Sequence, residues 1–226
     1  MLKKISVKNI TLVAVVFAMM SSPLFAQFDI GADVVSRYVW RGWDFGNSAA
    51  VQPALTYGTE LAGGALEIGA WGSFALTSGA ANENDLYVSY STGPVTVVVT
   101  DYYFPGYTGA DKFGNYGENG GHILEAGAGF SAGIFSLMGF YNFSGFDSEN
   151  SAYVELGVTP PYEVEGIELG LFVGAGNGVY DFVAAGESPE FVLTNVGLSV
   201  SKDNYSASYI VNPDQETSFL VFGISL

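Results

Sequence analysis

The sequence has no cysteine, one histidine and few charged residues, which make up 13% of its 226 positions. Without cysteine the chain forms no disulfide and performs no thiol chemistry. Only seven lysines and arginines stand against 23 acidic residues, and so acidic a protein repels nucleic acid, which excludes a DNA or RNA partner. A soluble domain usually carries about 25% charged residues. The low charged fraction, with 15% aromatic residues and 30 glycines, is typical of a protein whose outer surface faces lipid.

Long apolar runs are also missing, since none reaches the roughly 18 residues of a membrane-spanning helix. The apolar run at 10–20 follows Lys3, Lys4 and Lys8 and precedes the sequence Leu24-Phe25-Ala26. A charged start, an apolar centre and a small residue at the end define a secretory signal peptide. We therefore predict a cleaved signal at 1–26 and one domain at 27–226. That domain has a formal charge of −19, because four basic residues remain against the 23 acids.

What the sequence does contain is alternation of residue type along short segments. In the stretch 28–42 the odd positions are mostly polar or charged, and the even positions are apolar or aromatic. A β-strand sends successive side chains to opposite faces. Such a strand belongs either to a soluble sheet, with its charged face in water, or to an outer-membrane barrel, with its apolar face in lipid.

Twelve such segments follow one another, and no segment shows a sustained helical period. Most are near 9–11 residues long, the length of a tilted strand that crosses a membrane. Tight connections alternate with longer ones, as they do in outer-membrane barrels. The predicted strands are 28–41, 49–59, 64–77, 84–92, 94–103, 121–131, 133–143, 150–159, 166–176, 190–201, 204–212 and 217–226.

We therefore predict an all-β fold, a single antiparallel transmembrane β-barrel of twelve strands. The connection 160–165 is longer than the alternation requires, so counts of ten and fourteen strands stay open. In the strand 94–103, Thr96 and Thr100 imply one register and Asp101 implies the other, which indicates a bulge.

In a barrel the polar faces of the strands line the lumen. Arg37 and Arg41 are the only basic residues on these faces, and we expect them to meet Asp85, Glu125 and Glu155 across the exterior half of the lumen. Clustered acidic groups concentrate counter-ions, so we expect a preference for cations. The residues predicted to line the lumen and set its selectivity are Asp29, Asp33, Arg37, Arg41, Glu67, Trp71, Asp85, Glu125, Tyr153, Glu155 and Glu168.

Catalytic and metal-binding patterns are weak in this sequence. His122 could pair with a serine on the barrel wall, as in outer-membrane phospholipases, but no GxSxG motif accompanies it. Acidic residues in the longer connections could bind Ca²⁺ through oxygen atoms, yet none has EF-hand spacing. We expect no enzymatic activity, no cofactor and no metal site, with calcium binding in the loops left open. The loop acids are Asp111, Glu118, Asp147, Glu149, Asp181, Glu187, Asp214 and Glu216.

Five short motifs stand out in the chain: Ser36-Arg37-Tyr38-Val39-Trp40-Arg41-Gly42, Gln52-Pro53-Ala54, Trp71-Gly72-Ser73, Asp85-Leu86-Tyr87 with Tyr90, and Asp101-Tyr102-Tyr103-Phe104-Pro105-Gly106. Together they resemble the TorF family of porin-like proteins of Gram-negative bacteria. The resemblance spans the domain 27–226 but is concentrated in residues 33–106, and it implies an outer-membrane barrel with a pore. It implies no catalytic or ligand-binding residue.

We predict a channel in the outer membrane of a Gram-negative bacterium, through which small cationic or neutral solutes diffuse passively. Its expected partners are outer-membrane lipid, the solutes and, through the apolar face of the last strand with Phe222, Ile224 and Leu226, the barrel-assembly machinery. One alternative is a closed barrel without a pore that serves as a structural or surface-binding protein. Another is a lipid hydrolase that uses His122. The solute and the oligomeric state are left open.

Overall fold

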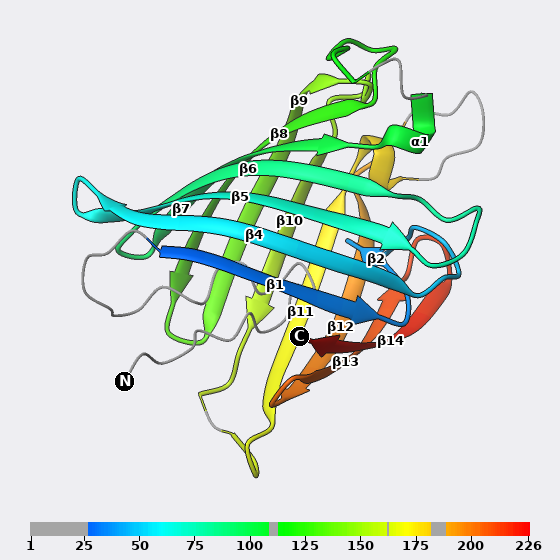
Figure 1. The fold of residues 1–226 in the computed structure, drawn as a ribbon. Coiled ribbons are helices and arrows are strands. Elements are labelled where there is room, and N and C mark those ends of the chain that lie inside the picture. The colour runs from blue at the N-terminus through cyan, green and yellow to red at the C-terminus, as the bar shows by residue number, and fades with distance from the viewer. Residues whose placement is uncertain (1–26, 109–112, 162, 182–188) are drawn as a thin grey trace.

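The structure, a computed structural model, describes residues 27–108, 113–161, 163–181 and 189–226. It is one closed antiparallel barrel of twelve strands, which confirms the predicted fold and strand count (Figure 1). The predicted signal at 1–26 lies outside the described residues. The barrel strands are β1 (Gln27–Val35), β4 (Ala50–Leu61), β5 (Gly64–Ala75), β6 (Glu83–Thr92), β7 (Val95–Tyr103), β8 (His122–Ala132), β9 (Phe135–Gly145), β10 (Ala152–Val158), β11 (Glu168–Gly176), β12 (Val192–Lys202), β13 (Tyr205–Asn212) and β14 (Thr217–Ser225).

Each barrel strand pairs with the strands before and after it, and β1 closes the barrel by pairing with β14. That closing seam is short. It joins three residue pairs, from Asp33 opposite Ser225 to Val35 opposite Gly223, whereas β1 and β4 share nine pairs. The remaining elements are short: β2 (Val39–Trp40), β3 (Trp43–Asp44), the helix α1 (Pro105–Thr108) and the 3₁₀ helix η2 (Gly178–Tyr180). Among the described residues, no helix is long and apolar enough to cross a membrane.

Alternation along the strands separates an apolar outer face from a mixed inner face. In β14, Leu220 and Phe222 are more than half exposed on the outside, while Phe219 and Val221 between them are buried on the inside. The bulge predicted in the strand 94–103 is wrong, because β7 pairs with β6 and β8 without a register shift, and Asp101 points outward. The register shifts lie elsewhere, in the β8–β9 and β11–β12 pairs.

The connections at the two ends of the barrel differ in length. One end, called the turn end here, carries the connections 62–63, 93–94, 133–134, 159–167 and 203–204. The connection 159–167 is the long one that left the strand count open, and it closes as a small hairpin through paired Val164 and Ile167. The opposite end, called the loop end, carries 36–49, 76–82, 104–121, 146–151, 177–191 and 213–216.

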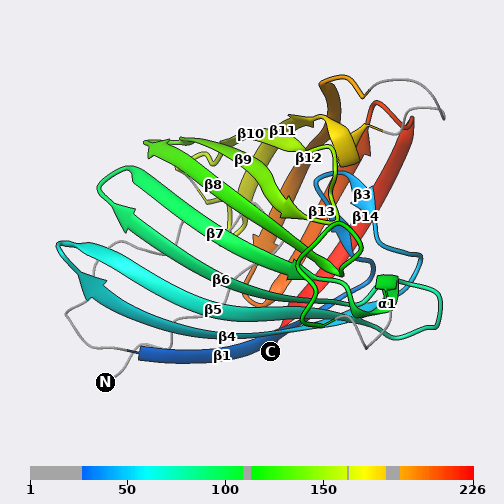
Figure 2. The ribbon, with the colours of Figure 1, turned by 90° about the horizontal axis from the view of Figure 1, so that it is seen from above.

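The first predicted strand, 28–41, is wrong in its second half. β1 ends at Val35, and the chain turns back into the barrel, where β2 and β3 pair as a hairpin (Figure 2). Arg41 and Gly42 form its two-residue turn with φ values of 52° and 83°, the positive values that a type I′ turn requires. Tyr38 and Trp40, predicted to face lipid, are therefore buried inside the barrel.

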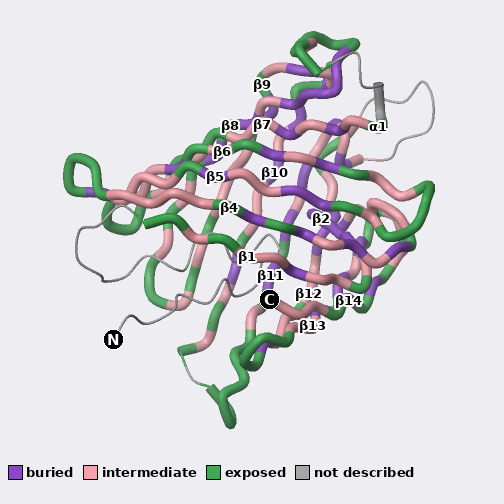
Figure 3. Tube along the Cα trace, in the orientation of Figure 1, coloured by how far each residue is buried: buried purple, intermediate pink, exposed green. Residues whose placement is uncertain are grey.

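The apolar core of this protein lies inside the barrel, at the loop end. Two clusters of buried side chains form it, one around Tyr38 and Trp40 and the other around Val39, Phe172 and Ile210. Buried stretches accordingly gather around β2, whereas the turns at the opposite end are exposed (Figure 3). The hairpin supplies residues to both clusters, and this position makes it the centre of the candidate site.

Candidate functional site

The segment 36–49, called the plug here, fills the loop-end half of the lumen. Because side chains alternate along β2, Val39 packs on one side of the barrel wall, with Phe172 and Phe219, while Trp40 packs on the other side, against Tyr102 and Tyr180. An isolated two-stranded hairpin is only marginally stable in water. Burial of both faces inside the barrel is what keeps this hairpin folded.

The tip of the plug is fixed to the barrel wall at β12 and β13. The backbone carbonyl of Gly42 accepts a hydrogen bond of 3.2 Å from the Asn212 side chain in β13. A Cβ atom on Gly42 would lie 1.8 Å from the backbone oxygen of Thr194 in β12. Only glycine fits this close approach, and its positive φ also favours glycine.

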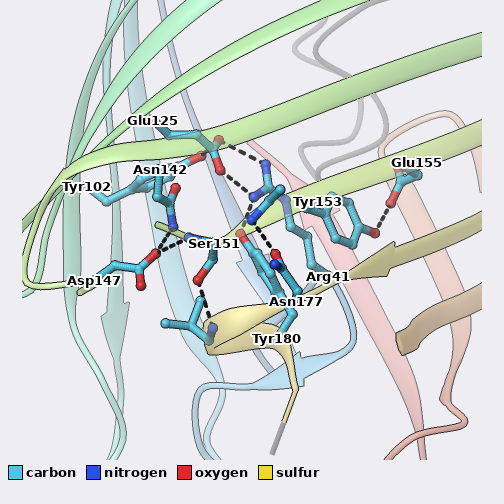
Figure 4. Close-up of polar contacts among 12 residues, drawn as sticks. Arg41, Tyr102, Glu125, Asn142, Asp147, Ser151, Tyr153, Glu155, Asn177 and Tyr180 are labelled. Atoms are coloured by element: carbon cyan, nitrogen blue, oxygen red, sulfur yellow. Dashed lines mark hydrogen bonds and ion pairs between the residues drawn. The ribbon is translucent and has the colours of Figure 1, made fainter. Parts of the chain in front are cut away.

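Arg41, at the same tip, forms a buried ion pair with Glu125 of β8 (Figure 4). Its two terminal nitrogens donate to the two carboxylate oxygens at 2.5 and 2.9 Å, the bidentate geometry that suits a guanidinium. Arg41 also contacts the Tyr180 hydroxyl, and the Tyr102 hydroxyl donates to Glu125 at 2.8 Å. Both charged side chains are about 2% exposed or less, so this pair is withdrawn from water.

Aromatic rings surround the guanidinium of Arg41. Its central carbon lies 4.1 Å from the ring centre of Phe140, 4.3 Å from that of Trp40 and 4.6 Å from that of Tyr153. Cations attract the faces of aromatic rings, most strongly where water is excluded. The cage and the carboxylate together hold the positive charge of Arg41 inside the barrel.

A second polar contact fixes the base of the plug. The Tyr38 hydroxyl donates to Glu83 of β6 at 2.8 Å, and Asp85 of the same strand is also buried. Burial, reinforced by the negative charge of Glu83, raises the pKa of the Tyr38 phenol, so the hydroxyl keeps the proton that it donates.

The eleven residues predicted to line the lumen all occupy inward positions of the strands or the plug. The structure brings Arg41 to Glu125 as predicted, but Arg37 meets none of its three predicted partners. Because the chain turns after Val35, Arg37 lies at the loop end, where it pairs with Asp44 of the plug at 3.2 Å.

The remaining members of the set lie along the wall. Glu67 accepts a hydrogen bond of 2.7 Å from Tyr87, and Glu168 accepts one of 3.2 Å from Ser201. The Tyr153 hydroxyl donates to Glu155 at 2.6 Å. The inward positions of Asp29, Asp33, Trp71 and Asp85 follow from the alternation of side chains between the two faces of β1, β5 and β6.

Several residues of the site were not predicted, namely Tyr38, Glu83, Tyr102, Phe140 and Tyr180. They belong to the site through contacts between residues far apart in the chain. A local signal for the plug was present in Trp40-Arg41-Gly42-Trp43, where a residue–glycine pair between two aromatic residues is typical of a tight hairpin turn.

His122 begins β8, as the sequence indicated, but it points to the outside of the wall beneath the loop 113–121. Its Nδ1 lies 2.8 Å from a carboxylate oxygen of Asp101, and its Nε2 lies 2.7 Å from the backbone oxygen of Phe113. The ring also stacks on Tyr116 and Tyr103. Both ring nitrogens are engaged with these partners, and neither contact is to a serine.

The loop acids contribute no metal centre in the part of the chain that the structure describes, where no group of three or more potential ligands comes together. Asp147 instead accepts hydrogen bonds from Asn142, Ser151 and Glu149, which closes the loop 146–151. Asp111 and Glu187 lie outside the described residues.

Comparison with known proteins places most of the chain in one family. A family model described as "Bacterial protein of unknown function (Gcw_chp)" matches residues 18–221. No curated protein and no solved structure matches the chain. The description of the family names neither TorF nor a porin, so that resemblance stays a prediction.

Proposed function

The chain belongs to the Gcw_chp family of bacterial proteins of unknown function, and we propose that it is a gated channel of the outer membrane. In this proposal the barrel crosses the membrane with its apolar outer face in lipid, and the plug closes the lumen at the loop end. Release of the plug tip opens a narrow path for small cationic or neutral solutes. The predicted signal at 1–26 and the sequence resemblance to TorF porins support the location and the channel.

The outer face of the barrel supports the location. Large apolar side chains on it are roughly half exposed along the strands, such as Val97 in β7, Leu137 in β9 and Leu220 in β14. A closed barrel is one of the two structures that can cross a bilayer, because its strands satisfy one another's backbone hydrogen-bonding groups. A soluble protein would expose this apolar surface to water, which is costly and favours aggregation.

The charge inside the barrel supports a preference for cations. Asp29, Glu67 and Glu168 line the turn-end half of the lumen, and the basic side chains of the described lumen, Arg37 and Arg41, belong to the plug. Arg41 is neutralised by Glu125, so the path below the plug carries net negative charge. Such a path raises the local concentration of cations and repels anions.

The observation that carries the gating proposal is the way the plug tip is held. One bidentate ion pair, one amide contact and a ring of aromatic side chains fix the tip across the lumen. These are separate, breakable contacts rather than a continuation of the barrel sheet, in which β2 and β3 take no part. A segment of this kind can leave the lumen without unpairing the barrel.

Planar-bilayer recordings of the purified protein test the proposal. We expect wild type to be closed for most of the time, and Arg41→Ala to open often, with reversal potentials in a KCl gradient that show cation selectivity. Replacing both Glu67 and Glu168 with glutamine in the Arg41→Ala background should reduce that selectivity. Arg37→Ala is the control, since it removes a cation from the plug without touching its tip. Anion selectivity would contradict the proposed role of the lumen acids.

A closed barrel without a pore is the second candidate, and burial of both plug faces favours it. It predicts that Arg41→Ala carries no current even when heat-modifiable migration on a gel shows that the barrel is folded. The same gel, with fractionation of cell membranes, tests the location. Recovery of wild type as a soluble periplasmic protein without detergent would contradict both candidates.

A further inference from the structure

Most of the cage around the Arg41 guanidinium is built by residues outside the plug, three from barrel strands and one from η2. Glu125 from β8, Tyr153 from β10 and Tyr180 from η2 each contact or face the guanidinium (Figure 4). Phe140 from β9 covers it as well. Trp40 is the one ring that the plug itself contributes. If the plug tip moves away, the Glu125 carboxylate and three aromatic rings therefore remain in place and form a site.

The chemistry of that site is specific for a flat organic cation. The two oxygens of Glu125 engage two nitrogens of one guanidinium, at 2.5 and 2.9 Å, and the rings of Phe140 and Tyr153 cover it at 4.1 and 4.6 Å. A delocalised, weakly hydrated cation loses little by leaving water and gains ring contacts. A sodium ion has neither the shape for the bidentate contact nor the weak hydration.

Arg41, whose guanidinium fills the cage, has a backbone conformation that is unfavourable for arginine. Arg41 has a φ of 52°, which is uncommon for a residue other than glycine. This conformation is maintained by the contacts of the side chain and by the turn, so a free cation that makes the same contacts does not carry the same backbone strain.

Negative charge around the cage also persists without Arg41. Glu155 lies next to the cage through its contact with the Tyr153 hydroxyl, at 2.6 Å, and Asn195 holds the same carboxylate oxygen at 2.9 Å. Glu83 and Asp85 lie buried beside the plug base on β6, which only β7 separates from β8. An empty cage would therefore hold uncompensated carboxylate charge in a confined space, which attracts a cation.

We infer that this cage is a binding site for small organic cations that carry a guanidinium or a similar flat cationic group, and that Arg41 is its tethered occupant. A free cation of this class competes with Arg41 for Glu125 and, when bound, leaves the plug tip without its ion pair. That such binding opens a path rests on the proposed channel function; the binding itself does not.

The test uses the full protein in detergent, with methylguanidinium chloride as the probe and sodium chloride at equal concentration as the control. The first readout is the unfolding temperature of Arg41→Ala, in which the cage is vacated. We expect methylguanidinium to raise it in a saturable way and sodium to have no comparable effect. The matched control is Arg41→Ala with Glu125→Gln, in which the carboxylate is lost and the saturable rise should disappear.

Tryptophan fluorescence of the wild type gives a second readout that does not depend on the variant folding. The three tryptophans of the chain, Trp40, Trp43 and Trp71, all lie in the plug or pack against its cluster. Competition should change this emission in wild type, with a half-saturating concentration about tenfold or more above that of Arg41→Ala, because the tethered arginine is present at high effective concentration. If Arg41→Ala does not fold, Arg41→Met replaces it, since methionine keeps the apolar stem.

The outcomes separate this inference from the channel function. Saturable binding without any current would support the cage and contradict the channel. Equal, non-saturable effects of methylguanidinium and sodium on both proteins would overturn the cage, whatever current the barrel carries. Retention of the saturable effect in the variant that lacks the Glu125 carboxylate would also overturn it.

Discussion

The two halves of the lumen are built from the same strands, yet one is filled by the plug and the other carries the acidic residues Asp29, Glu67 and Glu168. At the loop end, aromatic side chains surround a buried ion pair between Arg41 and Glu125. At the turn end, Glu67 and Glu168 each accept a hydrogen bond from one hydroxyl group and keep some exposure to water. Inward and outward side chains alternate in the same way along the whole length of the wall. The difference therefore comes from the plug, a single segment that a barrel of this size can enclose.

The largest difference between the halves should appear when Arg41 loses its side chain. Arg41→Ala leaves Glu125 buried without its partner, and breaking a buried pair in this way costs about 3–5 kcal/mol of the free energy of unfolding. Arg37→Ala breaks a pair that is about a quarter exposed, which is worth at most about 1 kcal/mol. Urea titration of both variants in detergent micelles measures the two losses, and equal losses would contradict the assignment of Arg41 as the residue that holds the plug.

Gly42→Ala should produce the next largest effect. The added Cβ would meet the Thr194 oxygen at 1.8 Å and would also sit at a φ of 83°, so we expect a loss of about 2–3 kcal/mol or displacement of the plug tip. The matched control is Gly63→Ala at the turn end, where φ is 84° and no atom lies within 4 Å. Backbone strain of about 1 kcal/mol is common to both variants. The additional destabilisation of Gly42→Ala over Gly63→Ala, measured by thermal unfolding, is the contribution of the close approach to the Thr194 oxygen. Equal destabilisation of the two variants would mean that the plug tip does not lie against β12.

Removal of single hydroxyl groups gives the smallest and sharpest comparison. Tyr38→Phe deletes a buried hydrogen bond to Glu83. We expect the free energy of unfolding to fall by about 2 kcal/mol, because no water can reach the buried carboxylate to replace the lost hydroxyl. Tyr87→Phe deletes the bond to Glu67 in the half-exposed turn-end half, where water can replace the hydroxyl, and about 1 kcal/mol or less is expected. A larger loss from Tyr87→Phe would reverse the assignment of the closed and the accessible half.

The barrel itself could be predicted from the sequence because its signals are local. Period-two alternation, as in Val95, Val97 and Val99, and the tight turns between strands identify each strand without reference to the others. Parity then assigns the inward faces, and it placed Glu125, Tyr153 and Glu155 on the correct side. The bulge predicted at Asp101 was wrong, because a polar residue near the end of a strand can face outward and pair with a histidine of the neighbouring strand.

The plug could not be predicted in the same way, because alternation continues through 36–41 after the barrel strand has ended. Tyr38 and Trp40 are apolar in either position, and parity alone cannot distinguish lipid from the interior of the barrel. The partners of Arg41 at Glu125 and Tyr180 are 84 and 139 residues away along the chain, so their contact depends on closure of the whole barrel. The positive φ of Arg41 and Gly42 is the feature that separates a strand from a hairpin here.

The most direct test of the account is the single-channel conductance of wild type against a variant in which residues 37–48 are replaced by a short glycine–asparagine linker. Both proteins would be recorded in the same bilayer after heat-modifiable migration shows that the barrels are folded. The account predicts rare openings in wild type and a steady, cation-selective conductance in the variant. Equal conductance in the two proteins would contradict the claim that segment 36–49 closes the lumen.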